Sequence, residues 1–455
     1  MPNKIGELII NTANWIWGTP LLVLLLGGGL FFLIYSRLIP FRYLGHALGI
    51  LTGKYDDPNE PGQLRHYQAL STALAGTIGM GNISGVAVAI TMGGPGAIFW
   101  MWVSALLGVS TKFFTCTLSV MYRGKDSAGV IQGGPMYFIT EGLGKNWKPL
   151  AVFFSIFGLI GVAPFFQANQ LTQTISDIIL VPNNIRESFQ SNFFTGAVIA
   201  LIVGIVVIGG IKRIGNVTGR MVPLMAIVYI VTVLYIVFSG VSRIIPAFTT
   251  IFRDAFTGNA VLGGSFGAVI ITGVRRAAFS NEAGIGTAPM AHGAAKTGEP
   301  VREGLVAMLG PMIDTIIICT MTALAIIITG VWVKSDADGI TLTAQAFEES
   351  IPIYGKYILT LCVIFFAMST MFAFPYYGSK CLGFVVGARY QHYYHYFFLI
   401  AIIIGALSRL RAVVAIADIA FALMAFPTVF STLILSPKVR SAAIDYFRRY
   451  KEKPT

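Results

Sequence analysis

Long apolar runs, separated by short polar or charged stretches, dominate the chain. A helix that crosses a bilayer needs about 20 predominantly apolar residues, and by that measure the sequence predicts eleven transmembrane helices. They cover residues 13–36, 66–91, 94–121, 149–180, 193–210, 217–239, 258–276, 304–331, 355–378, 393–408 and 412–435. The pattern predicts an all-α polytopic membrane protein.

Small and polar residues interrupt the second predicted span between Ala75 and Gly85. Four glycines lie there together with Thr77, Asn82 and Ser84, and each glycine costs a helix interior about 1 kcal/mol relative to alanine. We therefore predict that this helix breaks. Backbone groups freed at bilayer depth are tolerated only where they line a cavity or bind a ligand, so the break is predicted to form half of a solute and cation site. Close helix packing through small residues is the alternative.

The spans group into one additional helix and two equal halves. Residues 1–40 would form the additional N-terminal helix, 64–240 and 257–436 two repeats of five helices, and 437–455 a basic tail. Five spans per repeat force opposite orientations and predict a 5+5 inverted repeat with broken first helices. The second break is predicted at residues 263–267, another glycine cluster. Interrupted helices at matching positions indicate a transporter site between the repeats.

The basic residues predict how the chain lies in the cell membrane. Of the 32 Lys and Arg residues, 23 lie in alternate loops and in the tail, and 8 lie in the opposite segments. Cytoplasmic loops carry the excess of Lys and Arg. The N-terminus of this multi-pass protein is therefore predicted outside and the C-terminus in the cytoplasm.

Other functional classes fit the composition poorly. Only 11% of the residues are charged, against roughly 25% in soluble proteins, so the expected surroundings are a lipid bilayer. The net charge of +12 comes without a basic, aromatic face, so no nucleic-acid partner is expected. The five histidines have no metal-binding spacing and no nucleophile–base pair is present, which disfavours an enzyme. Few spans carry the polar stripe of a channel, and the four cysteines are expected to be buried thiols.

Five motifs resemble one known family. The chain resembles the alanine or glycine:cation symporters (sodium:alanine symporter family) over essentially its whole length. The motifs are GGPGAIFWMWV at 93–103, GGPMY at 133–137, QAN at 167–169, FSNEAG at 279–284 and YYG at 376–378. The resemblance implies cation-coupled symport, most simply with Na⁺, of a small neutral amino acid such as alanine or glycine, with no cofactor. It also implies the fold of the bacterial leucine transporter, preceded by one helix.

The resemblance also implies two cation sites at the first break, where GMGN at 79–82 matches the first core helix of that larger fold. One cation would bind the side-chain oxygen of Asn82 and the carbonyl of Thr77. A second would bind between two helices, and its implied ligands are the carbonyls of Ala75 and Ile78 with the hydroxyls of Ser369 and Thr370.

The residues themselves indicate how an amino acid would bind. Its carboxylate favours amide donors at a half-helix N-terminus, which Gly79, Gly81 and Asn82 would supply. Its ammonium favours amide oxygens, for which Gln167, Asn169 and Gln170 are candidates if they do not simply join helices. The predicted substrate-binding residues are Thr77, Gly79, Met80, Gly81, Asn82, Phe165, Phe166, Gln167, Gln170, Gly264, Phe266 and Phe374. Met80, Gln170 and Phe374 depart from the family pattern, which leaves the identity of the amino acid open.

Proton coupling is an alternative to Na⁺, because buried carboxylates often relay protons in membranes. Asp314 in the eighth span is the candidate, with Asp418 in the last span behind it. Either residue could instead pair with a polar group of a neighbouring helix, and Lys112 could snorkel or pair with a carboxylate.

A charged cluster follows the seventh span and is predicted on the cytoplasmic side. A hinge or gate network is the expected role of the cluster, whereas His292 is expected in a solvated loop. Its members are Arg275, Arg276, Glu282, His292, Lys296 and Arg302.

Overall fold

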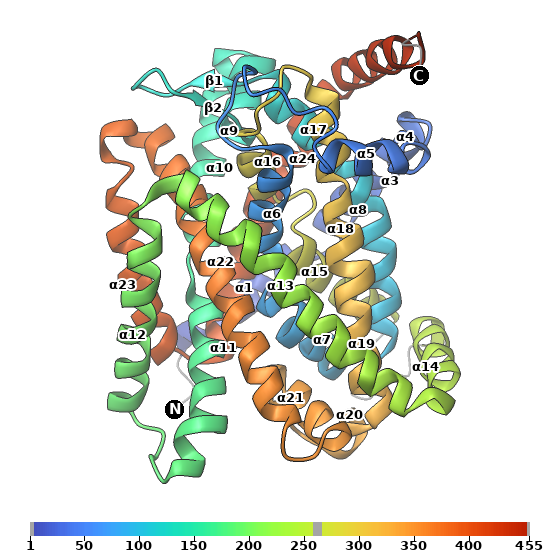
Figure 1. Cartoon of the computed structure of the whole chain (residues 1–455), viewed down its shortest axis with the longest axis vertical. Helices are drawn as coiled ribbons and strands as arrows, with labels where there is room; N and C mark the ends of the chain where they lie inside the picture. The colour runs from blue at the N-terminus through green and yellow to red at the C-terminus, as the bar shows by residue number, and fades with distance from the viewer. Residues whose placement is uncertain (1–3, 258–265, 453–455) are drawn as a thin grey trace.

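Helices form nearly all of the protein in a computed structural model that describes residues 4–257 and 266–452 (Figure 1). The helices of the N-terminal part are α1 (Lys4–Ile16), α2 (Thr19–Leu22), α3 (Gly28–Tyr35), α4 (Ile39–Arg42), α5 (Leu44–Leu51), α6 (His66–Thr77), α7 (Met80–Gly93), α8 (Gly96–Met121), α9 (Pro135–Tyr137), α10 (Lys148–Gly161), α11 (Phe165–Ile175), α12 (Phe189–Val207), α13 (Gly210–Ser239) and α14 (Ile244–Thr257). The remainder are α15 (Phe266–Asn281), α16 (Thr287–His292), α17 (Pro300–Ala307), α18 (Leu309–Pro311), α19 (Thr320–Thr329), α20 (Val331–Lys334), α21 (Gly339–Ser350), α22 (Gly355–Val386), α23 (Tyr393–Leu407) and α24 (Leu410–Glu452). A short antiparallel hairpin pairs β1 (Gly124–Lys125) with β2 (Ile131–Gln132).

Most of the predicted membrane spans correspond to helices of the right length. Within the described residues, eight helices are long and apolar enough to cross a bilayer, and nine if the bent pair Gly6–Ile16 and Thr19–Tyr35 is one span. The tenth predicted span matches the shorter apolar helix Tyr393–Leu407. Of the seventh predicted span, residues 266–276 lie in α15, and residues 258–265 lie outside the described part of the chain. The protein is therefore an integral membrane protein, while the count of eleven spans and the repeat stay predictions.

Two interrupted helices lie against each other in the middle of the molecule. The first consists of α6 and α7, as predicted, and the second of α15 and α16. A side-chain carbon added at Gly81 in α7 would lie 3.3 Å from the Phe279 carbonyl and 3.4 Å from Ser280 Cα in α15. The two breaks therefore meet.

The second interruption differs in position from the predicted one. Residues 263–265 of the predicted break lie outside the described residues, and Phe266 begins α15, which runs unbroken to Asn281. The helix is interrupted at residues 282–286, where Glu282, Gly284 and Gly286 have φ angles of 53°, 86° and 107°. These left-handed conformations cannot continue a right-handed helix. They end α15 about 20 residues after the glycine cluster at which the sequence predicted the break.

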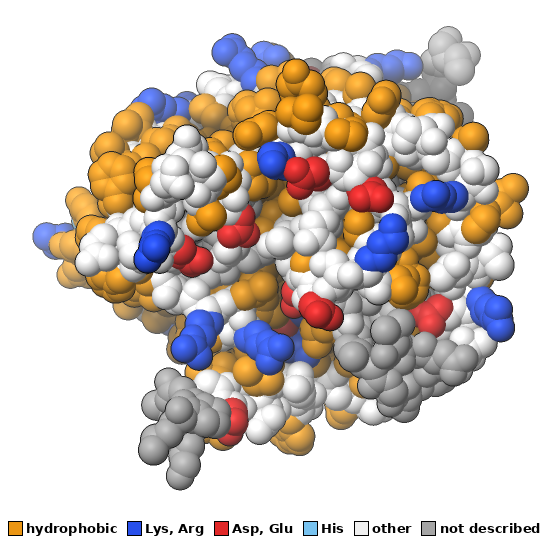
Figure 2. All heavy atoms as spheres, turned by 90° about the horizontal axis from the view of Figure 1, so that it is seen from below, with side chains coloured by type: hydrophobic (Ala, Val, Ile, Leu, Met, Phe, Trp, Pro, Cys, Tyr) orange, Lys and Arg blue, Asp and Glu red, His pale blue; other side chains and the backbone are white. Residues whose placement is uncertain are grey.

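The two ends of the molecule carry different elements (Figure 1). The upper end holds α4, α5, the β-hairpin, α16, α17 and the C-terminal residues, and the lower end holds α14, α20 and α21. Seen from below, charged side chains of both signs gather in the middle of the face and hydrophobic ones towards its edge (Figure 2). On the sides, Phe194, Leu201 and Ile208 of the α12 region are at least 67% exposed, as expected for residues that face lipid.

The charged cluster predicted on one side of the membrane is divided between two places. Arg275 and Arg276 lie inside α15, and both guanidinium groups bind the carboxylate of Asp418 at 2.6 Å. Asp418 lies in the third turn of α24, close to the lower end at which that helix begins. These two arginines therefore do not belong to an upper loop, and burial of Arg276 is tolerated because its charge is paired.

At the upper end, a buried carboxylate joins three helices. Glu303 of α17 binds the Nδ1 atoms of His66 in α6 and of His292 in α16, the latter at 2.5 Å. All three side chains are fully buried. The expectation of a solvated His292 was wrong, because its ring packs between the two interrupted helices and α17.

The last turns of α24 pack against α5 and the residue before it. His46 Nε2 lies 2.7 Å from the Tyr446 hydroxyl, and the ring of Phe447 stacks on Tyr43 with centroids 3.7 Å apart. Burial, with Arg302 nearby, lowers the pKa of His46 to about 4, so that the imidazole is neutral at pH 7. The C-terminal helix is thus attached by these aromatic contacts and by an ion pair between Arg449 and Glu299 at 2.6 Å.

Candidate functional site

The first break leaves backbone oxygens without helical partners. Helix α6 ends at Thr77 and α7 begins at Met80, while Ile78 (ψ 90°) and Gly79 (φ −154°, ψ −149°) are extended. The N–H of Gly79 donates to Asn82 Oδ1 at 3.0 Å. In a continuous helix this N–H would bond to the carbonyl of Ala75. That carbonyl is therefore released, and it faces the Ser369 hydroxyl of α22 at 3.5 Å.

The four ligands implied for the second cation site lie close together. Ser369 and Thr370 follow each other on α22, and a side-chain carbon at Gly79 would come within 2.5 Å of the Thr370 hydroxyl. Ala75, Ile78, Ser369 and Thr370 are all 0–1% exposed. Carbonyl and hydroxyl oxygens are the neutral ligands that a hard cation such as Na⁺ prefers. The arrangement has the chemistry of a Na⁺ site.

Asp314 connects the two interrupted helices. Its carboxylate accepts a hydrogen bond from Asn82 Nδ2 in the first break and, at 2.8 Å, one from the Ser280 hydroxyl at the end of α15. Its backbone carbonyl accepts from Asn82 Nδ2 at 3.1 Å. Asp314 lies in a π-helical segment, Met312–Cys319, whose wider turn is typical of functional sites in helices. Asp314 was expected either to relay protons or to pair with a polar group of a neighbouring helix. The geometry fits the pairing role.

Both the oxygen and the nitrogen of the Asn82 side-chain amide have partners in this structure. Its oxygen accepts from Gly79, and its nitrogen donates to Asp314 and, at 3.4 Å, lies near Cys319 Sγ. The oxygen that the resemblance assigns to a cation closes the start of α7 in this structure. A second lone pair of the same oxygen is still available for a cation.

Glu282 is a second acidic residue at the centre, although the sequence predicted it in the charged cluster after the seventh span. It is 2% exposed and accepts a hydrogen bond from the Thr287 hydroxyl across the break. The buried ammonium of Lys112 in α8 interacts electrostatically with both Glu282 and Asp314. The signal was present in the motif FSNEAG, where an acidic residue is followed by glycines inside an apolar region. Lys112 is 2% exposed, so its side chain lies inside the protein and does not snorkel to the membrane surface.

The three amides of α11 have different surroundings. Asn169 donates to the carbonyls of Gly405 and Ser408 at 3.3 and 2.6 Å, and Gln170 accepts from Ser84 at 2.5 Å. Both therefore join helices. Gln167 Oε1, in contrast, is buried and has no hydrogen-bond partner among the described residues.

One hydroxyl at the break is also unsatisfied. Thr77 Oγ1 is buried without a partner within the described part of the chain. A buried polar atom without a hydrogen bond costs about 1–3 kcal/mol. Thr77 at the end of α6 and Gln167 are hence the polar groups best explained by a bound ligand.

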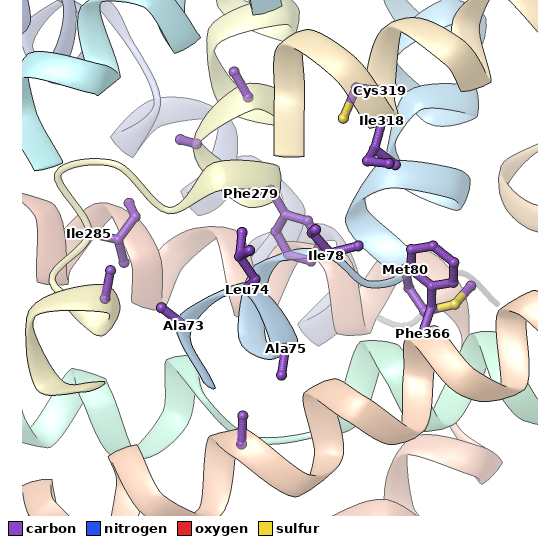
Figure 3. Packing of buried hydrophobic residues seen from close by; sticks show 14 of the residues in the cluster. Ala73, Leu74, Ala75, Ile78, Met80, Phe279, Ile285, Ile318, Cys319 and Phe366 are labelled. Atoms are coloured by element: carbon purple, nitrogen blue, oxygen red, sulfur yellow. The ribbon is translucent and has the colours of Figure 1, made fainter. Parts of the chain in front are cut away.

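Aromatic and sulfur side chains surround the breaks (Figure 3). The rings of Phe166 and Phe279 meet edge to face at 4.9 Å, and Phe279 lies against Gly81. Met80 is 1% exposed and belongs to the same hydrophobic cluster. Phe374 lies over Gly76, with 3.3 Å between its ring and an added side-chain carbon.

Two of the predicted lining residues are not brought to this centre, and a third is not described by the structure. The backbone of Phe165 packs against Gly405 of α23, and its side chain is only partly buried. Gly264 lies outside the described residues. Phe266 is fifteen residues before the end of α15, about 22 Å away along the helix. The expectation for Phe266 rested on the glycine cluster at 263–267, whereas the interruption seen within the described residues lies at 282–286.

Comparison with known proteins agrees with this geometry. The sequence profile of the sodium:alanine symporter family matches residues 3–455. The chain belongs to this family. The sodium/alanine symporter AgcS of Methanococcus maripaludis is 41% identical over 444 residues, covering 95% of each chain. A Bacillus subtilis protein named "Probable sodium/glutamine symporter GlnT" is 31% identical over 451 residues, covering 98% of this chain and 92% of GlnT.

The fold of this symporter has a solved counterpart. The crystal structure of MhsT in complex with L-phenylalanine superposes with a TM-score of 0.53 and covers 80% of this chain and 81% of MhsT at 12% identity. The likeness shows a shared leucine-transporter fold. The family and the relatives identify the chain as a cation-coupled amino-acid symporter and not an enzyme.

The close approach at Gly79 gives a steric test of the first break. In Gly79→Ala the new methyl would meet the Thr370 hydroxyl at 2.5 Å, so we expect a melting temperature lowered by overpacking worth about 1–3 kcal/mol and loss of cation-dependent uptake. Thermal unfolding and uptake measure the two effects.

The matched control is Gly85→Ala, six residues further along the chain and inside α7. Its added carbon would have its nearest neighbour at 4.0 Å, so stability and uptake should be retained. Equal behaviour of the two variants would contradict a packed cation site at Gly79.

Proposed function

We propose that the coupling ion is Na⁺ and that the substrate is a small neutral amino acid such as alanine or glycine. The observation that carries the proposal is the cluster of neutral oxygens around the first break: the released Ala75 carbonyl, with Ser369 and Thr370 beside Gly79. Neutral oxygens leave the positive charge of Na⁺ uncompensated. The carboxylate of a bound amino acid would balance that charge, which is a direct route to coupling.

The start of α7 is where we place the substrate carboxylate. The first N–H groups of a helix have no intrahelical acceptors, and the helix dipole favours an anion there. Gly79 donates to Asn82 Oδ1, and the Asn82 N–H bonds to the Gly79 carbonyl at 3.1 Å. Met80 and Gly81 therefore carry the remaining amides of that turn.

The unpaired oxygens of Thr77 and Gln167 are proposed to receive the substrate ammonium. The ammonium has three donors and no acceptor, so it needs oxygens of this kind. The large side chains of Met80, Phe166 and Phe279 surround the same region, which favours a substrate with a small side chain. Names of relatives that mention sodium, alanine and glutamine support the same substrate class.

Proton coupling through Asp314 is the second candidate, because this carboxylate is buried and connects both breaks. Its partners Asn82, Ser280 and Thr315 all offer donors. Three donors around one carboxylate favour a carboxylate that stays ionised and accepts these hydrogen bonds throughout. We therefore assign Asp314 a positioning role and Na⁺ the coupling role.

Uptake into proteoliposomes tests this assignment. We expect accumulation of labelled alanine and glycine driven by an inward Na⁺ gradient, and weaker accumulation of glutamine. Ser369→Ala should raise the Na⁺ concentration for half-maximal uptake about tenfold, because one ion ligand is lost. Thr360→Ala is the control, since this hydroxyl of the same helix lies nine residues before Ser369, about 14 Å away along the helix, and bonds to the Lys356 carbonyl.

Uptake indifferent to Na⁺ but driven by a proton gradient would reverse the assignment in favour of Asp314. Glutamine transported better than alanine would keep Na⁺ coupling and refute the small substrate. An unchanged Na⁺ response of Ser369→Ala would remove the α22 hydroxyls from the site.

We further propose that the upper end faces the cytoplasm. Arg275 and Arg276 lie in the lower half and do not count toward the basic residues of the upper end. Without them, the upper end still has more Lys and Arg residues than the lower end. The C-terminal helix, with Arg440, Arg448 and Arg449, lies at that end.

Cysteine labelling tests the orientation with little background, because all four native cysteines are buried. In intact cells, a membrane-impermeant maleimide should label Glu349→Cys, an exposed position of α21 at the lower end. It should label Ser441→Cys, exposed on α24, only after permeabilisation. The reverse pattern would place the upper end outside.

A further inference from the structure

Four arginines surround a pocket that the transport mechanism does not use. The pocket has a volume of about 480 Å³ and lies at the upper end, where α3 and α4 meet the C-terminal part of α24. Arg37, Arg42, Arg440 and Arg448 line it, and none of its lining residues is acidic. Such a concentration of like charge attracts anions to the pocket.

Most of this charge is uncompensated. The side chains of Arg37 and Arg42 are exposed and have no hydrogen bond or ion pair within the described residues. Arg440 lies over the ring of Tyr35, 4.6 Å from its centroid, a contact that holds the guanidinium in place without neutralising it. Arg448 is paired with Asp445 at 2.7 Å. Three arginines therefore point positive charge at one volume.

The backbone presents the first of these arginines in an unusual way. Arg37 and Leu38 are consecutive non-glycine residues with φ angles of 55° and 61°. This left-handed conformation is costly for residues with a side chain and is concentrated at functional sites. It turns the chain sharply between α3 and α4 directly at the pocket.

An exposed apolar stripe leads from the pocket along α3. Leu30, Ile34 and Leu38 are 47%, 67% and 49% exposed. Residues four apart lie on one face of a helix, so the first two continue towards Leu38 and the arginines. Ile444 on the pocket rim is 58% exposed as well. The site thus combines a phosphate-binding head with a surface suited to a hydrocarbon chain.

We propose that this pocket binds the phosphodiester headgroup of an anionic phospholipid, with its acyl chain along α3. Guanidinium groups match phosphate oxygens in pairs, and basic pockets between transmembrane helices bind anionic headgroups. The lipid would join the N-terminal helix, which precedes the two interrupted helices, to the C-terminal helix.

Lipid binding to the purified full-length protein tests the proposal. Native mass spectrometry with phosphatidylglycerol should show one retained lipid, and phosphatidylcholine at the same concentration should not. Arg37→Gln with Arg42→Gln and Arg440→Gln should weaken phosphatidylglycerol binding about 100-fold, because each basic residue contributes about a factor of five. Arg37→Gln with Arg42→Gln alone should weaken it in the same direction, and these exposed side chains contribute little to folding.

The control removes two charges elsewhere at the same end. Lys145→Gln with Arg389→Gln, both exposed, should leave phosphatidylglycerol binding unchanged. Equal binding by the Arg37/Arg42 variant and this control would overturn the site. Equal retention of phosphatidylcholine would overturn recognition of the anionic headgroup. Thermal stabilisation by inorganic phosphate alone, with none added by the lipid, would assign the pocket to a soluble anion.

Discussion

The hydrogen bonds of Asp314 hold together the two helix breaks on which transport depends. A broken helix at bilayer depth has unsatisfied backbone groups, and two broken helices would separate unless something joined them. Asp314 joins them from a third helix by binding Asn82 on one side and Ser280 on the other. The buried ammonium of Lys112 lies in the same region, 3.2 Å from a side-chain carbon added at Gly310. Buried polar groups of this kind are stable only when they are hydrogen-bonded.

This network also explains why the ion site can be neutral. The acidic residues at the centre are occupied by the protein itself, so the oxygens around Gly79 come from carbonyls and hydroxyls. A cation placed there lacks a counter-charge until an amino-acid carboxylate arrives at the start of α7. In the proposed mechanism, ion and substrate would then stabilise each other by direct contact.

The sequence predicted the position of the first break but not the interruption seen at residues 282–286. The reason is that composition does not show backbone conformation or contacts between distant residues. At residues 76–85 glycines and polar residues coincide, and the helix ends at Thr77 as expected. In the second half, a break was expected at 263–267 because glycines cluster there. The observed break at Glu282 depends on left-handed φ angles and on Thr287 binding the carboxylate, neither of which composition reveals. Likewise, Arg276 seemed to end a span because its partner Asp418 is 142 residues away.

The central claim is that Na⁺ and the amino acid bind together between the two breaks. Equilibrium binding of labelled alanine to the purified symporter tests it most directly, with choline replacing Na⁺ at constant ionic strength. We predict that Na⁺ lowers the dissociation constant of alanine and that alanine lowers that of Na⁺ by the same factor, as linkage requires. An alanine affinity that is the same in Na⁺ and in choline would contradict the account.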